Sequence, residues 1–134
     1  HWSWQSGHVH AGGGYLNYED NDSAADNNRD VYYFQLDAVQ NLNAGQNIWY
    51  AGARYSRITA DDGFPLVANG NMDRYEFDNS LLTTELWRFG ITLGYRIGHN
   101  FLIKTEYNFE RGKFVDDTNR NGEDLFGIEA AFRF

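Results

Sequence analysis

Several charged side chains that could act on an ion or a solute lie within segments where apolar and polar residues alternate. Between residues 86 and 110, for example, Arg88, Arg96, Lys104 and Glu106 all occupy even positions. Residues two apart on a β-strand share a face of the sheet, so these side chains form a row of mixed charge. Such a row can set the field across a pore and select among solutes, or its members can pair and stiffen the wall. The residues expected to line this face are Asp37, Arg54, Arg88, Arg96, Lys104, Glu106, Glu110, Glu129 and Arg133.

The sequence offers little for catalysis or tight metal binding. Serines are few, and none lies in a nucleophile motif or pairs with a histidine on a strand, so we predict no catalytic residues and no enzyme activity. His8 and His10 share one side of a predicted strand, but no third ligand lies at a suitable spacing, which favours a plain pair over a metal site. Residues 117–122 match the front of a calcium loop, although the position of its bidentate acid is Ile128. No cofactor is expected, apart from Ca²⁺ gathered loosely at the acidic loops.

The elements that carry these residues are predicted to be β-strands with two different faces. In the clearest strand, apolar residues occupy the odd positions from Trp87 to Ile97, and polar residues or glycine occupy the even ones. The same alternation recurs along the chain, so the fold class expected is all-β and antiparallel. The predicted strands lie near residues 8–18, 31–40, 48–58, 86–97, 101–110 and 124–134.

A short turn at residues 98–100 fixes how two of these strands pair. Both strands carry their apolar residues at odd positions, so residues that face each other must have the same parity. The turn then places Arg88 opposite Glu110 and Lys104 opposite Gly94.

The composition is compatible with two-faced β-strands and argues against a membrane-spanning helix and against nucleic-acid binding. The 134 residues carry a formal charge of −8 and include no cysteine and one proline. No run approaches the roughly 18 to 20 apolar residues that a spanning helix needs, whereas a spanning strand needs only about 9 to 11. The negative charge argues against nucleic-acid binding. The first residues lack the basic and apolar parts of a signal peptide, so we expect either a processed protein or a piece of a longer one.

The end of the sequence resembles the closing strand of bacterial outer-membrane β-barrel proteins. Apolar residues alternate with small or polar ones up to a terminal aromatic residue, at Phe126, Ile128, Ala130, Phe132 and Phe134. This resemblance implies a location in the outer membrane and recognition of the C-terminal strand by the barrel-insertion machinery. More narrowly, residues 104–109, the Asp/Asn-rich segment that follows and the sequence Phe126-Gly-Ile-Glu are similar to the end of phosphate-selective-type porins.

Two further patterns agree with a membrane barrel. The expected connections alternate between long and short, as external loops and periplasmic turns do, at residues 19–30, 41–47, 59–85, 98–100 and 111–123. Aromatic residues of the apolar face gather near strand ends, where barrels carry aromatic girdles at both membrane interfaces. The girdle residues expected are Trp49, Tyr55, Trp87, Tyr95, Phe101, Phe109, Phe126, Phe132 and Phe134.

The six predicted strands are too few for a closed barrel, because closed barrels begin at about eight strands. We therefore expect residues 1–134 to form one segment, the C-terminal part of a larger transmembrane barrel whose other strands come from the same or another chain. A soluble β-sandwich or lipocalin-like barrel is the alternative, but its interior would have to hold Trp49, Trp87 and many other rings.

The function expected is that of an outer-membrane porin for passive diffusion of small hydrophilic solutes, with lipid and lipopolysaccharide as neighbours. The alternative is a non-conducting barrel that acts as an anchor, translocator or sheath for a partner protein.

Overall fold

The structure, a computed structural model, describes residues 1–18, 29–64, 82–121 and 124–133. In these residues the chain is all-β, with eight strands and no helix. The strands are β1 (Trp2–Trp4), β2 (Gly7–Tyr18), β3 (Arg29–Asn41), β4 (Asn47–Phe64), β5 (Thr83–Ile97), β6 (Phe101–Phe114), β7 (Asn119–Arg120) and β8 (Leu125–Phe132).

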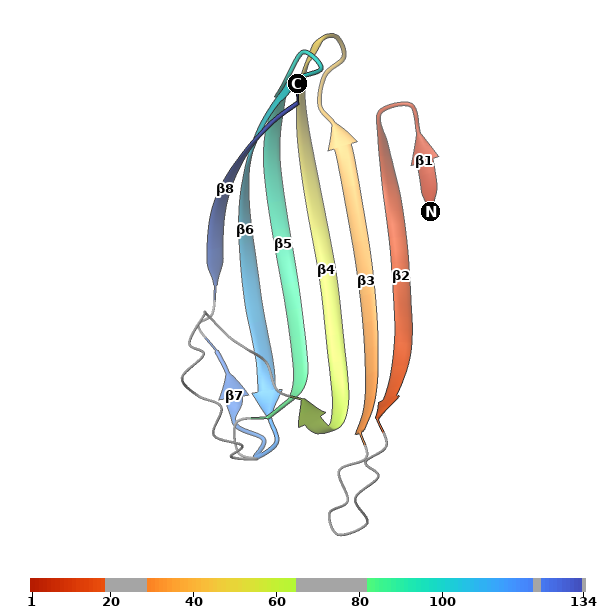
Figure 1. Cartoon of the computed structure of the whole chain (residues 1–134), viewed down its shortest axis with the longest axis vertical. Helices are drawn as coiled ribbons and strands as arrows, with labels where there is room; N and C mark the ends of the chain where they lie inside the picture. Colours follow the sequence, from red (N-terminus) through yellow and green to blue (C-terminus); the bar gives the residue numbers. More distant parts are fainter. Residues whose placement is uncertain (19–28, 65–81, 122–123, 134) are drawn as a thin grey trace.

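All the strands belong to one antiparallel sheet (Figure 1). Strands β1 to β6 lie side by side in chain order, and β6 pairs on its other edge with β7 and β8. The all-β, antiparallel class predicted from the alternation is therefore confirmed. The sheet is open, because within the described residues β8 does not pair with β1 or β2, so barrel closure stays a prediction.

The structure corrects the number and the bounds of the predicted strands. A short strand that was not among the six predicted, β1, forms a hairpin with β2 in which Trp2 pairs with Val9. β7 lies in a segment predicted to be loop, and β4 and β5 extend into the predicted loop 59–85. There Thr59 faces Glu85, so the backbone ladder continues beyond the point where the apolar alternation stops.

The strands are long for a globular protein. β2 to β6 contain 12, 13, 18, 15 and 14 residues, whereas strands in globular proteins usually contain about five or six. Each of the five exceeds the roughly 9 to 11 residues that a tilted strand needs to cross the hydrocarbon core of a membrane. β8 is shorter, with 8 residues. No helix in the described part of the chain is long and apolar enough to cross a membrane.

The register predicted from the turn at residues 98–100 is confirmed. Arg88 pairs with Glu110 and Lys104 pairs with Gly94 across β5 and β6. The turn begins at Gly98 with a φ of 57°, a left-handed conformation that is costly for residues with a side chain. Turn length and residue parity together were sufficient to fix this pairing.

The sheet has two faces of opposite character, and its small core lies on one of them. We call the side that carries Arg54, Arg88 and Lys104 the charged face, and the side that carries Trp49 and Ile91 the apolar face. The buried apolar side chains of the described residues lie toward the end of the charged face nearest the β2–β3 and β4–β5 connections; they are Val31, Ala60, Leu82 and Leu86. Most large apolar side chains of the described residues are instead exposed.

Candidate functional site

The apolar face is a continuous surface that the strand register assembles from β4, β5, β6 and β8. Successive rows across the sheet contain Tyr55–Phe89–Phe109, Ala53–Ile91–Tyr107–Phe126 and Ala51–Leu93–Thr105–Ile128. The side chains in the middle of this surface are exposed, with relative areas of 47% for Ile91 and 67% for Ile128. An exposed apolar surface of this extent marks a membrane or protein contact.

Every predicted girdle residue within the described part of the chain lies on the apolar face; these are Trp49, Tyr55, Trp87, Tyr95, Phe101, Phe109, Phe126 and Phe132. Phe134 lies outside the described residues. Near the short turns, the rings of Trp49 and Tyr95 have centroids 4.5 Å apart. Toward the opposite end, the rings of Tyr15 and Tyr32 are 5.0 Å apart. The placement agrees with two bands of aromatic rings, and their role in a membrane stays a prediction.

Ion pairs border the apolar face at the end away from the short turns. Arg57 lies 3.0 Å from Glu85, and Arg111 lies 2.5 Å from Asp124. The hydrogen bond from the Arg111 guanidinium holds the pKa of Asp124 below its ordinary value, and a second hydrogen bond from the Tyr107 hydroxyl acts in the same direction. This border was not predicted from the sequence, although Arg57, like Trp49, occupies an odd position on β4 and so belongs to the apolar face.

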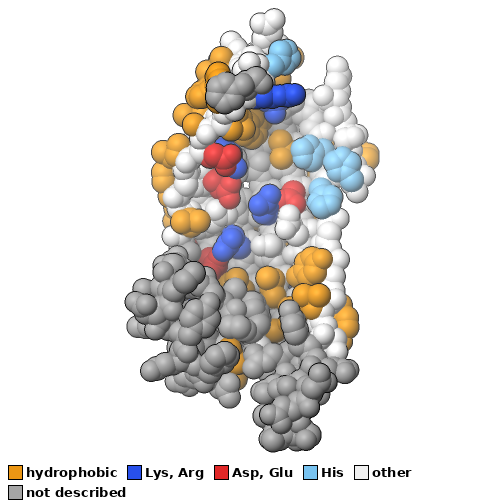
Figure 2. Space-filling view, in the orientation of Figure 1, with side chains coloured by type: hydrophobic (Ala, Val, Ile, Leu, Met, Phe, Trp, Pro, Cys, Tyr) orange, Lys and Arg blue, Asp and Glu red, His pale blue; other side chains and the backbone are white. Residues whose placement is uncertain are grey.

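The charged face brings together all the residues predicted to line a pore, since the register aligns their positions on one side of the sheet. Figure 2 shows this face, with acidic and basic side chains grouped around its hollowed centre. The hollow spans β3 to β6 and is lined by Asp37, Arg54, Thr92, Lys104 and Glu106 among others. The mixed charge makes it suitable for water and polar solutes.

Most cations of the charged face are paired with acids. Asp37 accepts a hydrogen bond from Arg54 at 2.5 Å, and Lys104 lies 2.9 Å from Glu129. Glu106 lies 3.9 Å from Lys104. The pairs Arg54–Asp37 and Lys104–Glu129 join neighbouring strands, so they support the interpretation of a stiffened wall as much as that of a selective one.

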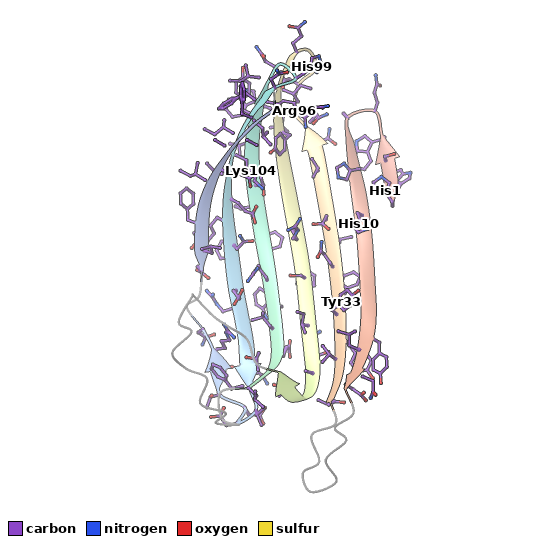
Figure 3. The ribbon with its side chains drawn as sticks, in the orientation of Figure 1. His1, His10, Tyr33, Arg96, His99 and Lys104 are labelled. Carbon is purple, nitrogen blue, oxygen red and sulfur yellow. The ribbon has the colours of Figure 1, made fainter. Side chains whose placement is uncertain are left out.

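Arg96 and Arg133 are different, because neither is paired with an acid in the described part of the chain. They line one hollow beside the turn between β5 and β6, together with His99 and Asn100. The backbone amide of Arg133 donates to the carbonyl of Asn100, which holds the two segments together. Arg96 and His99 are labelled near the top of Figure 3. This end of the charged face is therefore its most positive part.

A buried ionic cluster lies at the other end of the charged face. Glu110 accepts a hydrogen bond from Arg88 at 2.7 Å and lies 3.5 Å from Arg120 of β7. Arg120 is 6% exposed and donates to the hydroxyl of Thr83 at 3.2 Å. Sequence reasoning missed Arg120 because it treated residues 111–123 as a loop.

Two tyrosine rings on the charged face lie over glycines of neighbouring strands. Tyr50 faces Gly94 in the register, and a Cβ built on Gly94 would lie only 2.1 Å from the Tyr50 ring. Tyr33 covers Gly14 in the same way, with a closest approach of 2.5 Å. The two rings thus fill the space beside these glycines, close to the sheet.

The calcium-loop pattern at residues 117–122 does not form a gathered set of acids in the described residues. Asp117 has a φ of 61°, and Asp116 accepts hydrogen bonds from the Thr118 amide and hydroxyl. These hydrogen bonds also hold the pKa of Asp116 below its ordinary value. Residues 116–118 therefore form a tight turn that leads into β7.

Comparison with known proteins finds no matching family, no curated relative and no similar solved structure. The class of protein must therefore be argued from the two faces of the sheet themselves.

Proposed function

We propose that this chain forms part of the wall of an outer-membrane β-barrel channel through which small hydrophilic solutes diffuse. The observation that carries the proposal is the difference in polarity between the two faces of the sheet. One face exposes rows of Ile, Leu, Phe and Ala, and the other carries ion pairs around a hollow. A wall between lipid and water requires this division, with apolar residues outside and polar residues inside.

The dimensions and the chemistry of the sheet support the same proposal. The strands β2 to β6 are long enough to cross the hydrocarbon core, and aromatic rings lie toward both ends of the apolar face. Charged pairs begin where the apolar rows stop, at Arg57 and Arg111. Lipid would cover the apolar rows, and lipopolysaccharide headgroups would lie beside the charged border.

Closure of the barrel requires further strands. An unpaired strand edge in hydrocarbon leaves backbone groups without partners, at several kcal/mol each. The open edges at β1–β2 and β8 would therefore pair with strands of the same or another chain. The insertion machinery would act on β8, as the resemblance of the C-terminal pattern implies.

A second candidate is a filled barrel that anchors or encloses a partner protein. This candidate is supported by side chains that already fill part of the charged face. Glu110 and Arg120 are each 6% exposed, and the Tyr33 and Tyr50 rings lie flat over glycines. These groups leave less room for solutes than a wholly open wall would.

The test uses single cysteines, because the chain has none of its own. Ile91 and Thr92 are neighbours on β5 that lie on opposite faces. The variants Ile91→Cys and Thr92→Cys would be made in the full-length protein, and outer membranes would be treated with a water-soluble maleimide. A channel protects the cysteine at 91, which lipid covers, and exposes the cysteine at 92 to the reagent.

Other outcomes separate the alternatives. Protection of both cysteines, together with no steady conductance in planar bilayers, favours the filled barrel. Labelling of both cysteines overturns the membrane proposal, because Ile91 is 47% exposed in the sheet without lipid. If the cysteine labelling supports a barrel, the migration of the protein in gels before and after boiling in detergent shows whether one chain or several complete it.

A further inference from the structure

Three of the four histidines gather at one edge of the charged face, where β1 meets β2. His8 and His10 lie two residues apart on β2 and so share this face. Trp2 pairs with Val9, so continuation of the register places His1 beside His10. Figure 2 shows the histidine side chains grouped on this part of the face, and His1 and His10 are labelled in Figure 3.

The imidazole ring of His1 lies near the other two rings. The ring centroid of His1 lies 5.7 Å from that of His8 and 6.2 Å from that of His10. Two imidazoles on one tetrahedral zinc ion, each bound at about 2.0 to 2.1 Å, have centroids about 5 Å apart. The present separations exceed that value by about 1 Å.

We propose that His1, His8 and His10 form a binding site for Zn²⁺, with a fourth coordination position open to solvent. No three His, Asp or Glu side chains of residues 1–18, 29–64, 82–121 and 124–133 are already gathered as ligands. The site therefore forms on binding, by rotation of the exposed His1 side chain between rotamers. Three neutral imidazoles with an open fourth position suit zinc, and they also accept Cu²⁺ or Ni²⁺.

Asp37 gives the site an outer partner. Its Oδ2 atom lies 3.6 Å from Nδ1 of His10, on the adjacent strand β3. The carboxylate is itself held by Arg54 and by Gln35, whose amide donates to it at 2.6 Å. A carboxylate held in this way orients the imidazole and directs its other nitrogen toward the metal. Asp37 is thus a positioning residue.

Metal binding at this site would also stabilise the edge of the sheet. β1 contains only 3 residues and directly follows His1, while β2 contains the other two ligands. A bound ion would join the two strands at the edge where the sheet is open. This inference does not depend on a conducting pore, so failure of either proposal leaves the other standing.

The test is calorimetric titration of the full-length protein with ZnCl₂. One ion should bind per chain, and X-ray absorption of the bound zinc should show three nitrogen ligands at about 2.0 Å. His8→Gln and His10→Gln should each remove this binding. The matched control is His99→Gln, because His99 lies at the β5–β6 turn, apart from the cluster.

Asp37→Asn should weaken binding by about 10- to 100-fold, and Asp37→Glu should restore part of it, whereas a general structural defect would not be rescued by the longer acid. The proposal is overturned if no ion binds at one per chain. It is also overturned if zinc binding survives in His8→Gln and His10→Gln, since the acidic loops would then be the ligands. The proposal is likewise overturned if His99→Gln loses as much zinc binding as His8→Gln and His10→Gln do.

Discussion

Removal of the charge on Glu110 should destabilise the protein far more than removal of the charge on Glu129. Both are acids on the charged face that pair with a cation of a neighbouring strand. Their burial differs, because the side chain of Glu110 is 8% exposed and that of Glu129 is 56% exposed. The pair of substitutions Glu110→Gln and Glu129→Gln therefore compares the same chemical change in two environments.

The expected losses in the free energy of unfolding follow from this difference in burial. Glu110→Gln removes the charge of one partner of Arg120, which is 6% exposed, and the loss of one partner of a buried pair costs about 3 to 5 kcal/mol. The glutamine retains one acceptor for Arg88, so we expect a loss near the lower end, about 3 kcal/mol. Glu129→Gln affects an exposed pair with Lys104 and should cost less than about 1 kcal/mol.

The assay is urea unfolding of the full-length protein in lipid or detergent, with the free energy of unfolding taken from the midpoint and slope. Arg120→Met should also cost less in the Glu110→Gln background than in the wild-type protein, because the two residues act on each other. Equal losses for the two acids would refute the buried cluster. So would strict additivity of Glu110→Gln and Arg120→Met.

Two other outcomes follow from the charged face. Gly94→Ala should lower the free energy of unfolding by about 1 to 3 kcal/mol, since the new Cβ would lie 2.1 Å from the Tyr50 ring. Gly127→Ala, whose Cβ would meet nothing within 4 Å, should change it by less than about 0.5 kcal/mol, and similar losses for both would contradict the packing. In planar bilayers, Arg96→Glu and Lys104→Glu should each shift the reversal potential toward cation selectivity; an unchanged potential would show that these residues do not line a pore.

The two faces of the sheet were predictable from sequence because they depend on parity alone. Along each strand, residues two apart point to the same side, so the alternation from Trp87 to Ile97 separates the apolar residues from Arg88 and Arg96 without knowledge of the partner strands. The turn at residues 98–100 added the register of β5 and β6, because a short turn leaves few ways to pair its flanking strands.

The ends of the strands and the cluster of three histidines were not predictable in this way. β4 and β5 continue into residues 59–64 and 83–85, where backbone pairing persists without apolar alternation. The pair His8 and His10 was visible in the sequence, but its third member was not. His1 reaches them only because β1 folds back on β2.

The amino-acid pattern alone was sufficient to predict an all-β fold, strands with an apolar and a charged face, and the residues on each face. These properties are local, since they follow from a period of two residues and from short turns. Which of the other charges meet became clear only from the folded sheet, as in the contacts of Arg54 with Asp37 and of Lys104 with Glu129. Those contacts join residues far apart in the chain, and their register depends on the whole ladder of backbone hydrogen bonds between strands.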